Sequence, residues 1–257
     1  MNSLFESSPL YLRQITLLRE QVPSFHQYPF DLTAIRSLDQ LAFRKPVTFI
    51  VGENGTGKST LLEGLAVAWG FNPEGGSMNF SFSTSATHSE LYRYLRLSRG
   101  VQRPRDGFFL RAESYYNVAT NIEELDAIAS PGPKIKESFG GKSLHEQSHG
   151  ESFLNTFLHR FGGRGMYMMD EPEAALSPLR QMTLLARMYE LVNKQSQFII
   201  ATHSPILMSY PNAEIWQLNE DGVHLVELEE TDHYIITKSF MNDREAMIRT
   251  LFEADGD

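Results

Sequence analysis

The stretch that most constrains the fold is residues 49–64, which read FIVGENGTGKSTLLEG. An apolar run ends in a glycine-rich loop, and Lys58, Ser59 and a helical pattern follow directly. Between a strand and a helix, the spacing Gly-x-x-x-x-Gly-Lys-Ser is the Walker A pattern. Backbone N–H groups in such a loop turn inward, so the loop and the helix start can hold a phosphate chain. The sequence therefore predicts a nucleotide site in an α/β fold.

The nucleotide is expected to contact nine consecutive residues: Gly52, Glu53, Asn54, Gly55, Thr56, Gly57, Lys58, Ser59 and Thr60. Within this set, the Lys58 ammonium should reach the β- and γ-phosphates and so take part in catalysis. The Ser59 hydroxyl should be a ligand of Mg²⁺. The motif by itself leaves ATPases, GTPases and nucleotide kinases open.

A second motif ends in acidic residues further along the chain. Residues 165–170 read GMYMMD, and Glu171 follows. This is the Walker B arrangement, in which Asp170 would hold Mg²⁺ because a hard cation prefers oxygen ligands. Successive side chains of an extended segment point to opposite sides, so Glu171 points away from Asp170. It can therefore orient and deprotonate an attacking water, which contributes about 10²–10⁴ in rate. A second acid at this place favours hydrolysis over phosphoryl transfer by a kinase.

The rest of the chain alternates strand and helix patterns. Strands are predicted at residues 10–22, 46–52, 108–112, 165–170, 197–202, 214–218 and 223–228. Helices are predicted at residues 59–69, 114–129, 151–161, 177–194 and 242–253. This order predicts a P-loop α/β fold with a mostly parallel sheet flanked by helices. We expect a single domain over residues 1–257, with a small antiparallel β insertion at about 72–107 and a helical subdomain at 114–163.

The composition of the chain bears on its cellular compartment and on its partners. The chain has no cysteine, which excludes disulfides and thiolate metal sites and suits a reducing cytosol. It shows no secretory signal pattern, and no apolar run approaches the ~20 residues that a membrane span needs. A cytoplasmic protein is expected. The formal net charge of −9 argues against a surface devoted wholly to nucleic acid, yet it permits a local basic patch.

A third segment, Ser148-His149-Gly150-Glu151-Ser152, lies between the two Walker motifs and opens an amphipathic helical pattern. A serine and a glycine at a helix start favour an anion site. Because the Walker A loop already forms one complete phosphate site, the simplest ligand for the second is the γ-phosphate of a nucleotide bound to another copy of the chain.

These motifs resemble those of the ABC-type ATPase superfamily, in particular its soluble SMC/RecF-like branch and small bacterial AAA-family ATPases. The elements GENGTGKST, SHGES, MYMMDEP and ATHSP match in chain order across about residues 46–205. The resemblance implies binding of ATP with Mg²⁺, hydrolysis, and an ATP-dependent homodimer in which each head completes the other's site. It implies trans contacts from the signature residues Ser148, His149, Gly150 and Glu151. It also implies that His203 is the switch histidine, which contacts the γ-phosphate and helps to set the attacking water.

The sequence departs from the family pattern at several positions. The signature has His149 in place of a glycine, and Ser177 stands where the D-loop usually has an aspartate. At the Q-loop position Glu113 follows the second core strand, so a carboxylate would be the Mg²⁺ ligand there, while Gln102 lies before that strand. Glu113 could equally be an acid facing a helix dipole. Three aromatic residues are candidates for stacking on adenine: Phe25, Tyr28 and Phe30.

Three kinds of partner are open. Six arginines with interleaved Tyr92 and Tyr94 suit phosphate contact and base stacking on nucleic acid: Arg93, Arg96, Arg99, Arg103, Arg105 and Arg111. A solvated face or a protein-docking surface would account for the same charges. The chain could instead be the ATP-binding subunit of a membrane transporter, docked on a separate protein. A third possibility is an ATP-gated switch for a protein contact, with slow hydrolysis as its timer.

Overall fold

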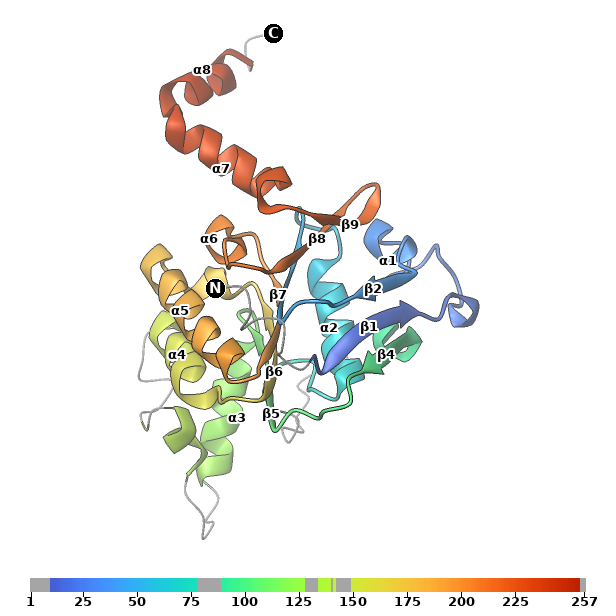
Figure 1. Ribbon diagram of the computed structural model, residues 1–257, viewed down its shortest axis with the longest axis vertical. Coiled ribbons are helices and arrows are strands. Elements are labelled where there is room, and N and C mark those ends of the chain that lie inside the picture. Colours follow the sequence, from blue (N-terminus) through green and yellow to red (C-terminus); the bar gives the residue numbers. More distant parts are fainter. Residues whose placement is uncertain (1–9, 78–88, 128–133, 140, 142–148, 255–257) are drawn as a thin grey trace.

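The computed structural model describes residues 10–77, 89–127, 134–139, 141 and 149–254. Its centre is a six-stranded sheet, in which the first five strands run parallel and the last pairs antiparallel with its neighbour (Figure 1). In spatial order the strands are β5 (Asp106–Arg111), β6 (Gly165–Asp170), β7 (Gln197–Ala201), β3 (Val47–Val51), β8 (Glu214–Asn219) and β9 (Gly222–Val226). The predicted α/β class with a mostly parallel sheet is confirmed.

The two faces of this sheet pack into two separate cores. Side chains alternate along each strand, so Tyr167 and Met169 of β6 face one core while Met166 and Met168 face the other. Because both faces are covered, every residue of β3, β6 and β7 is buried. The apolar runs of the sequence therefore mark the central strands.

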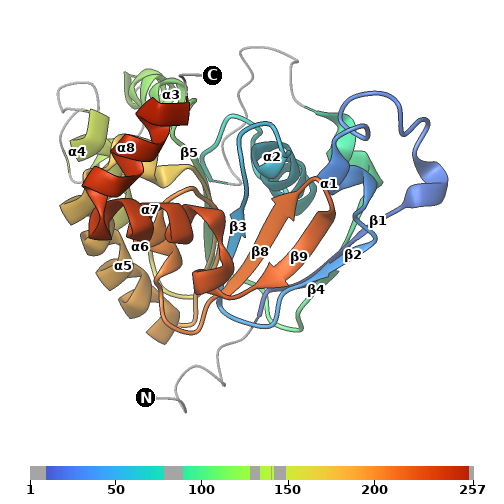
Figure 2. The ribbon, with the colours of Figure 1, turned by 90° about the horizontal axis from the view of Figure 1, so that it is seen from above.

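The first core lies under α3 (Tyr115–Ala127), α4 (His149–Asn155) and α5 (Pro178–Asn193), which cover one face of the sheet (Figure 2). Phe153, Phe157 and Phe161 are all buried in this core, as the helical spacing predicted. The helical run does not continue as an α-helix: after Asn155 it becomes a π-turn, η5 (Thr156–Arg160).

The second core lies around α2 (Lys58–Trp69), between the central sheet and a three-stranded antiparallel sheet. In spatial order, this small sheet contains β2 (Gln40–Ala42), β1 (Leu12–Leu17) and β4 (Leu95–Arg99). The small antiparallel sheet is present, but most of it lies outside the expected insertion at about 72–107. Only β4 comes from that range; it pairs with β1, and β1 pairs in turn with β2.

No strand ladder joins the two sheets among the described residues, but the buried side chain of Gln197 connects them. The amide oxygen of Gln197 accepts hydrogen bonds from the backbone N–H groups of Tyr11 (2.8 Å) and Leu12 (2.9 Å). Its amide nitrogen donates to the carbonyl of Leu12 at 2.9 Å. The glutamine thus replaces a peptide group at the start of β1.

The C-terminal region contains more helix than the sequence pattern indicated. After the predicted β8–β9 hairpin come the 3₁₀ turn η7 (Leu228–Glu230), α7 (Asp232–Asn242) and α8 (Arg244–Ala254). Helices α7 and α8 extend away from the body of the protein, and none of the residues of α7 is buried (Figure 1). Within the described parts of the chain, no helix combines the length and apolar character that crossing a membrane requires.

Candidate functional site

The Walker A loop connects β3 to α2 in a conformation that only glycine tolerates. Gly52 has a φ of 146°, and a Cβ there would lie 2.2 Å from the carbonyl oxygen of Leu218 in β8. Gly55 and Gly57 also have positive φ, and Gly57 is the N-cap of α2. The glycines of the motif therefore allow the loop to fold tightly against the neighbouring strand.

Lys58 lies inside this loop. Its ammonium donates to the carbonyl of Glu53 at 2.9 Å, and the residue is only 4% exposed. Burial lowers the pKa of Lys58, and the nearby carboxylates of Glu171 and Asp170 oppose that shift. The ammonium is thus held at the centre of the loop, beside the acidic end of β6.

The two Walker motifs meet through a direct hydrogen bond. The Ser59 hydroxyl donates to Oδ1 of Asp170 at 3.0 Å, across 111 positions of sequence. Burial raises the pKa of Asp170 to about 6, while the Arg111 guanidinium and the Ser59 hydrogen bond oppose the rise. The structure therefore brings together Ser59 and Asp170, two of the residues predicted to hold Mg²⁺.

Arg111 completes this region, in a role that the sequence pattern did not indicate. Its Nε lies 3.5 Å from Oδ2 of Asp170, and its Nη1 lies 2.7 Å from Oε2 of Glu63 on α2. The side chains of Arg111, Glu63 and Asp170 are 15%, 13% and 8% exposed. Arg111 is enclosed between two carboxylates beside the Walker motifs. It is therefore not one of the exposed arginines that could contact nucleic acid.

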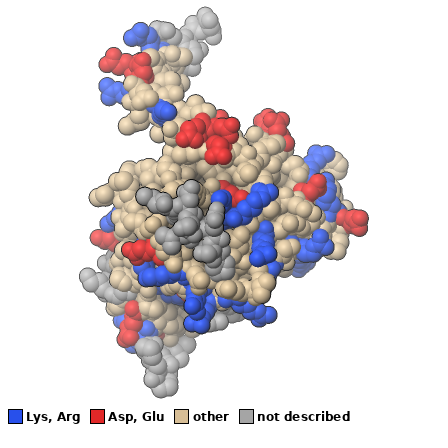
Figure 3. Space-filling view, viewed as in Figure 1, with Lys and Arg blue, Asp and Glu red and all other residues tan. Residues whose placement is uncertain are grey.

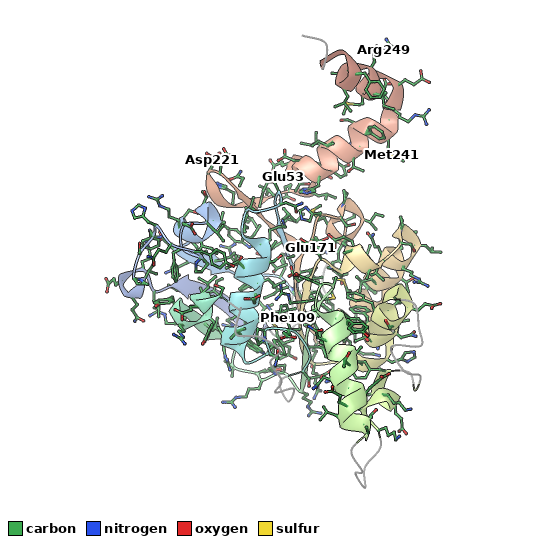
Figure 4. The ribbon with its side chains drawn as sticks, turned by 180° about the vertical axis from the view of Figure 1, so that it is seen from behind. Glu53, Phe109, Glu171, Asp221, Met241 and Arg249 are labelled. Atoms are coloured by element: carbon green, nitrogen blue, oxygen red, sulfur yellow. The ribbon has the colours of Figure 1, made fainter. Side chains whose placement is uncertain are left out.

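Glu171 follows Asp170 with a left-handed backbone (φ 48°, ψ 53°). Its N–H donates to the carbonyl of Ala201 at the end of β7. Its Oε1 lies 3.5 Å from Nε2 of His203, which comes from the loop after β7. The residues predicted as general base and switch histidine therefore lie side by side. Figure 4 shows that Glu171 and Glu53 come from loops at the same end of the sheet, whereas Phe109 lies within β5.

His203 is anchored by two further residues. Its backbone N–H donates to Oε1 of Glu173, and its Nδ1 lies 2.8 Å from Nε2 of His233 at the start of α7. Burial lowers the pKa of His203, as do the charges of Lys58 and His233. Sequence reasoning missed His233: Thr231 before it is a local helix-start signal, but nothing local indicates which residue the helix start meets.

A cavity of about 370 Å³ opens beside these groups, lined by Ser59, Ala112, Glu113, Asp170, Glu171 and Ala174. Glu113 lines this cavity and lies 3.4 Å from Nη2 of Arg111. Gln102 is exposed in the turn between β4 and β5 and is not among the lining residues. The geometry therefore favours Glu113 over Gln102 for the Q-loop position, which stays a prediction.

The signature segment is only partly described. Ser148 and the side chain of His149 lie outside the described residues. A methyl group at Gly150 would lie 2.5 Å from the carbonyl oxygen of Ala175, and Glu151 lies 3.8 Å from Arg180 of α5. The start of α4 therefore packs against the segment that follows Walker B, where Ser177 is the N-cap of α5.

The three candidate adenine-stacking residues have different surroundings. Phe30 is buried in the core, and Phe25 packs edge-on against Phe30 and lies under the guanidinium of Arg19. Tyr28 is 63% exposed, and its hydroxyl lies 3.3 Å from that of Thr60 at the start of α2. Tyr28 is thus the candidate with a free ring face beside the Walker A loop.

Of the remaining predicted arginines, Arg96 and Arg99 lie on β4 of the small sheet, and Figure 3 shows Lys and Arg side chains gathered on one face of the molecule. Arg99 packs over the ring of Trp69, with 4.4 Å from Cζ to the centroid, and donates to its carbonyl. Arg93 pairs with Glu90. Tyr94 packs edge-on against Phe30 rather than facing solvent fully. The exposed members of the set are Arg93, Arg96, Arg99, Arg103 and Arg105.

The residues present fit a nucleotide and a magnesium ion. Ser59 and Asp170 offer oxygen donors to the same cavity, as Mg²⁺ requires. Nε2 of His203 is a buried nitrogen without a hydrogen-bond partner, and it points toward the carboxylate of Glu171. The donor set therefore suits a triphosphate with its cation.

Two families match adjoining parts of the chain. The first, described as "AAA domain", matches residues 25–139. The second, described as "AAA domain, putative AbiEii toxin, Type IV TA system", matches residues 143–209.

Individual relatives are distant. "Energy-coupling factor transporter ATP-binding protein EcfA" of Methanococcus maripaludis is 23% identical over 77% of this chain and 74% of its own length. "Ribose import ATP-binding protein RbsA" of Yersinia pestis is 26% identical over 73% of this chain, which spans only 38% of that protein. Among solved structures, the SMC head domain from Thermotoga maritima aligns with a TM-score of 0.45 and 14% identity, over 85% of this chain and 99% of that domain.

The order of the motifs along the chain agrees with the two family matches, which together include both Walker motifs and His203. The chain therefore carries the motifs of a P-loop ATPase domain and matches families described as AAA domains over residues 25–139 and 143–209.

Proposed function

We propose that this protein binds ATP with Mg²⁺ and hydrolyses it, and that two copies associate around the nucleotide. The matches to AAA domains are consistent with a nucleotide site at the Walker motifs. The observation that carries the proposal is the convergence of Ser59, Asp170 and Glu171 around one cavity beside the Walker A loop, with His203 next to Glu171.

Each residue has a distinct role in the proposed reaction. Lys58 and the N–H groups of the loop bind and orient the triphosphate. Magnesium, when bound by Ser59 and Asp170, neutralises the charge that develops on the phosphates. Glu171 orients a water molecule and accepts its proton. His203 presents Nε2 to the γ-phosphate, and this hydrogen bond would satisfy a nitrogen that otherwise lacks a partner.

The dimeric part of the proposal rests on the signature segment. One copy has a complete Walker A loop, so Ser148, His149, Gly150 and Glu151 are proposed to contact the γ-phosphate bound to the other copy. Gly150 cannot carry a side chain without displacing the carbonyl of Ala175, which supports a close fit of α4 against the segment after Walker B. Tyr28 is proposed to stack on adenine, since its ring is exposed beside Thr60.

Size measurement of Glu171→Gln with and without ATP and Mg²⁺ tests the proposal. The amide keeps the shape of the side chain but cannot accept the proton, so the variant should accumulate as an ATP-bound dimer. Lys58→Ala is the matched control, because it should stay monomeric under the same conditions. A Glu171→Gln variant that stays monomeric with saturating ATP would refute the shared site, and wild-type hydrolysis in an Asp170/Glu171 double variant would refute the catalytic assignment.

A second candidate is coupling to nucleic acid, which is favoured by exposed arginines around the small sheet in a chain of net charge −9. Filter binding at several salt concentrations tests it. Salt-sensitive binding should be lost when Arg96, Arg99 and Arg103 are replaced together by alanine. Absence of binding even at low salt would remove this candidate and leave a protein partner or an ATP-gated switch.

A transporter subunit is a third candidate, because EcfA and RbsA are named as ATP-binding proteins of transport systems. Fractionation of cells that contain the tagged protein at its natural level would decide this point. Recovery with the membranes would favour a transporter, and recovery in the supernatant with and without ATP would reject it.

A further inference from the structure

We propose that His233 is a positioning residue for His203, and that it holds the His203 ring with a proton on Nε2, facing Glu171. The inference rests on the proposed ATP hydrolysis, to which it adds a residue from the C-terminal helices. His233 lies outside the four motifs, and α7 lies outside the two family matches, which end at residue 209.

The geometry is a chain of three side chains. Nε2 of His233 lies 2.8 Å from Nδ1 of His203, which is a hydrogen-bond distance. The opposite nitrogen of the same ring, Nε2 of His203, lies 3.5 Å from Oε1 of Glu171. The His203 ring is therefore bracketed, with His233 behind it and the proposed general base in front.

These two neighbours determine which ring nitrogen of His203 carries the proton. A neutral imidazole carries one N–H, and the other nitrogen accepts. The Glu171 carboxylate is an acceptor only, so it favours the N–H of His203 on Nε2. Nδ1 is then the acceptor, and Nε2 of His233 must be the donor. With this tautomer, His203 offers a hydrogen to a phosphate oxygen, whereas the other tautomer would present a lone pair to it.

The position of His233 is fixed by the turn before α7 rather than by burial of the helix. Thr231 is fully buried, and its hydroxyl accepts from the N–H of Tyr234 as the N-cap. Before it, Glu227 and Glu230 form a reciprocal capping box around η7. No residue of α7 is buried, and these caps and the contact with His203 are among the interactions that hold the helix start against the body.

Three substitutions separate positioning from simple packing. His233→Ala removes the donor. His233→Gln places an amide N–H near the position of the lost Nε2, so it should restore the bond. His233→Asn has the same chemistry, but its amide reaches only about as far as Nδ1 and should not restore it. His224→Ala is the matched control, because His224 is an exposed histidine on β9.

The first readout is steady-state ATP hydrolysis. His233→Ala and His233→Asn should lower kcat about 10- to 100-fold, the scale of a misplaced catalytic group, with KM for ATP changed by less than about twofold. His233→Gln should recover most of the rate, and His224→Ala should match the wild type. Equal loss in the alanine and glutamine variants, or a loss in KM alone, would overturn the proposal.

The second readout needs neither nucleotide nor magnesium. The ¹⁵N signals of neutral histidine distinguish a protonated from an unprotonated ring nitrogen, and the His203 signals are identified by their absence in His203→Gln. In the wild type and His233→Gln, Nε2 of His203 should be the protonated nitrogen, while His233→Ala should show a mixture. An unchanged tautomer in His233→Ala would refute the inference even if the protein hydrolysed ATP as proposed. A wild-type protein without ATPase activity but with the expected tautomers would instead refute the proposed function alone.

Discussion

Replacement of Arg111 by alanine is expected to lower the free energy of unfolding by about 3–5 kcal/mol at pH 8, the cost of removing one partner of a buried ion pair. Arg111 lies 2.7 Å from the Glu63 carboxylate and 3.5 Å from that of Asp170. With an effective dielectric constant of about 20, these distances correspond to attractions of about 6 and 5 kcal/mol. Desolvation of the guanidinium offsets much of this gain. The variant nevertheless leaves two carboxylates enclosed without their cation.

The pH dependence identifies the cause of this loss. Burial raises the pKa of Asp170 to about 6, and the Arg111 guanidinium opposes that rise. Without Arg111 the pKa of Asp170 in the folded state rises further. The folded variant then binds more protons than the unfolded chain over a wider range of pH. Its free energy of unfolding therefore falls as the pH rises through that range. The loss of free energy of unfolding in Arg111→Ala, relative to the wild type, should therefore be smaller at pH 5 than at pH 8.

Urea unfolding at the two pH values measures both quantities, and the melting temperature should fall by about 6–20 °C at pH 8. Arg96→Ala is the control, because Arg96 is exposed on β4 and its loss should cost less than about 0.5 kcal/mol. A loss below about 1 kcal/mol for Arg111→Ala, or an equal loss at pH 5 and pH 8, would show that Arg111 does not stabilise the two carboxylates.

Three further outcomes are expected. Gly52→Ala should lower the free energy of unfolding by about 2 kcal/mol or more in denaturation experiments, because its Cβ would meet the carbonyl of Leu218. Gly55→Ala has open space around it and should cost only about 1–2 kcal/mol. Asp170→Asn should stabilise the nucleotide-free protein by up to about 3 kcal/mol at pH 8 and by less than about 1 kcal/mol at pH 4, since a carboxyl with a raised pKa opposes folding only when it is charged. Lys58→Ala should abolish binding of a fluorescent ATP analogue, and retained binding would contradict its place in the phosphate loop.

Local patterns were sufficient for the central elements. The run before Gly52 and the pattern after Ser59 predicted β3 and α2 within one residue at each end, because a buried strand and a phosphate loop leave few alternatives. The acids after β6 were predicted at the carboxyl end of a parallel strand, where they meet the loop after β3. These features depend on short-range spacing and on the rule that parallel strands present their carboxyl ends to one edge.

Long-range contacts were not predictable in the same way. Arg111 follows a run of exposed arginines in sequence and looks like one of them, yet its neighbours in space are Glu63 and Asp170. β4 pairs with β1, which lies some eighty residues earlier (Leu17↔Leu95), so no local turn signal could identify its partner. His233 meets His203 across 30 positions through a helix that the sequence pattern did not reveal.

The left-handed backbone of Glu171 has a consequence for how this position tolerates change. A glutamate held there gives up about 1–2 kcal/mol that a glycine would not. The proposed general base therefore occupies a position where glycine would fit the backbone with less strain. Glu171→Gly should yield an inactive protein that melts later than its parent, whereas a β-branched substitution should be both inactive and fragile.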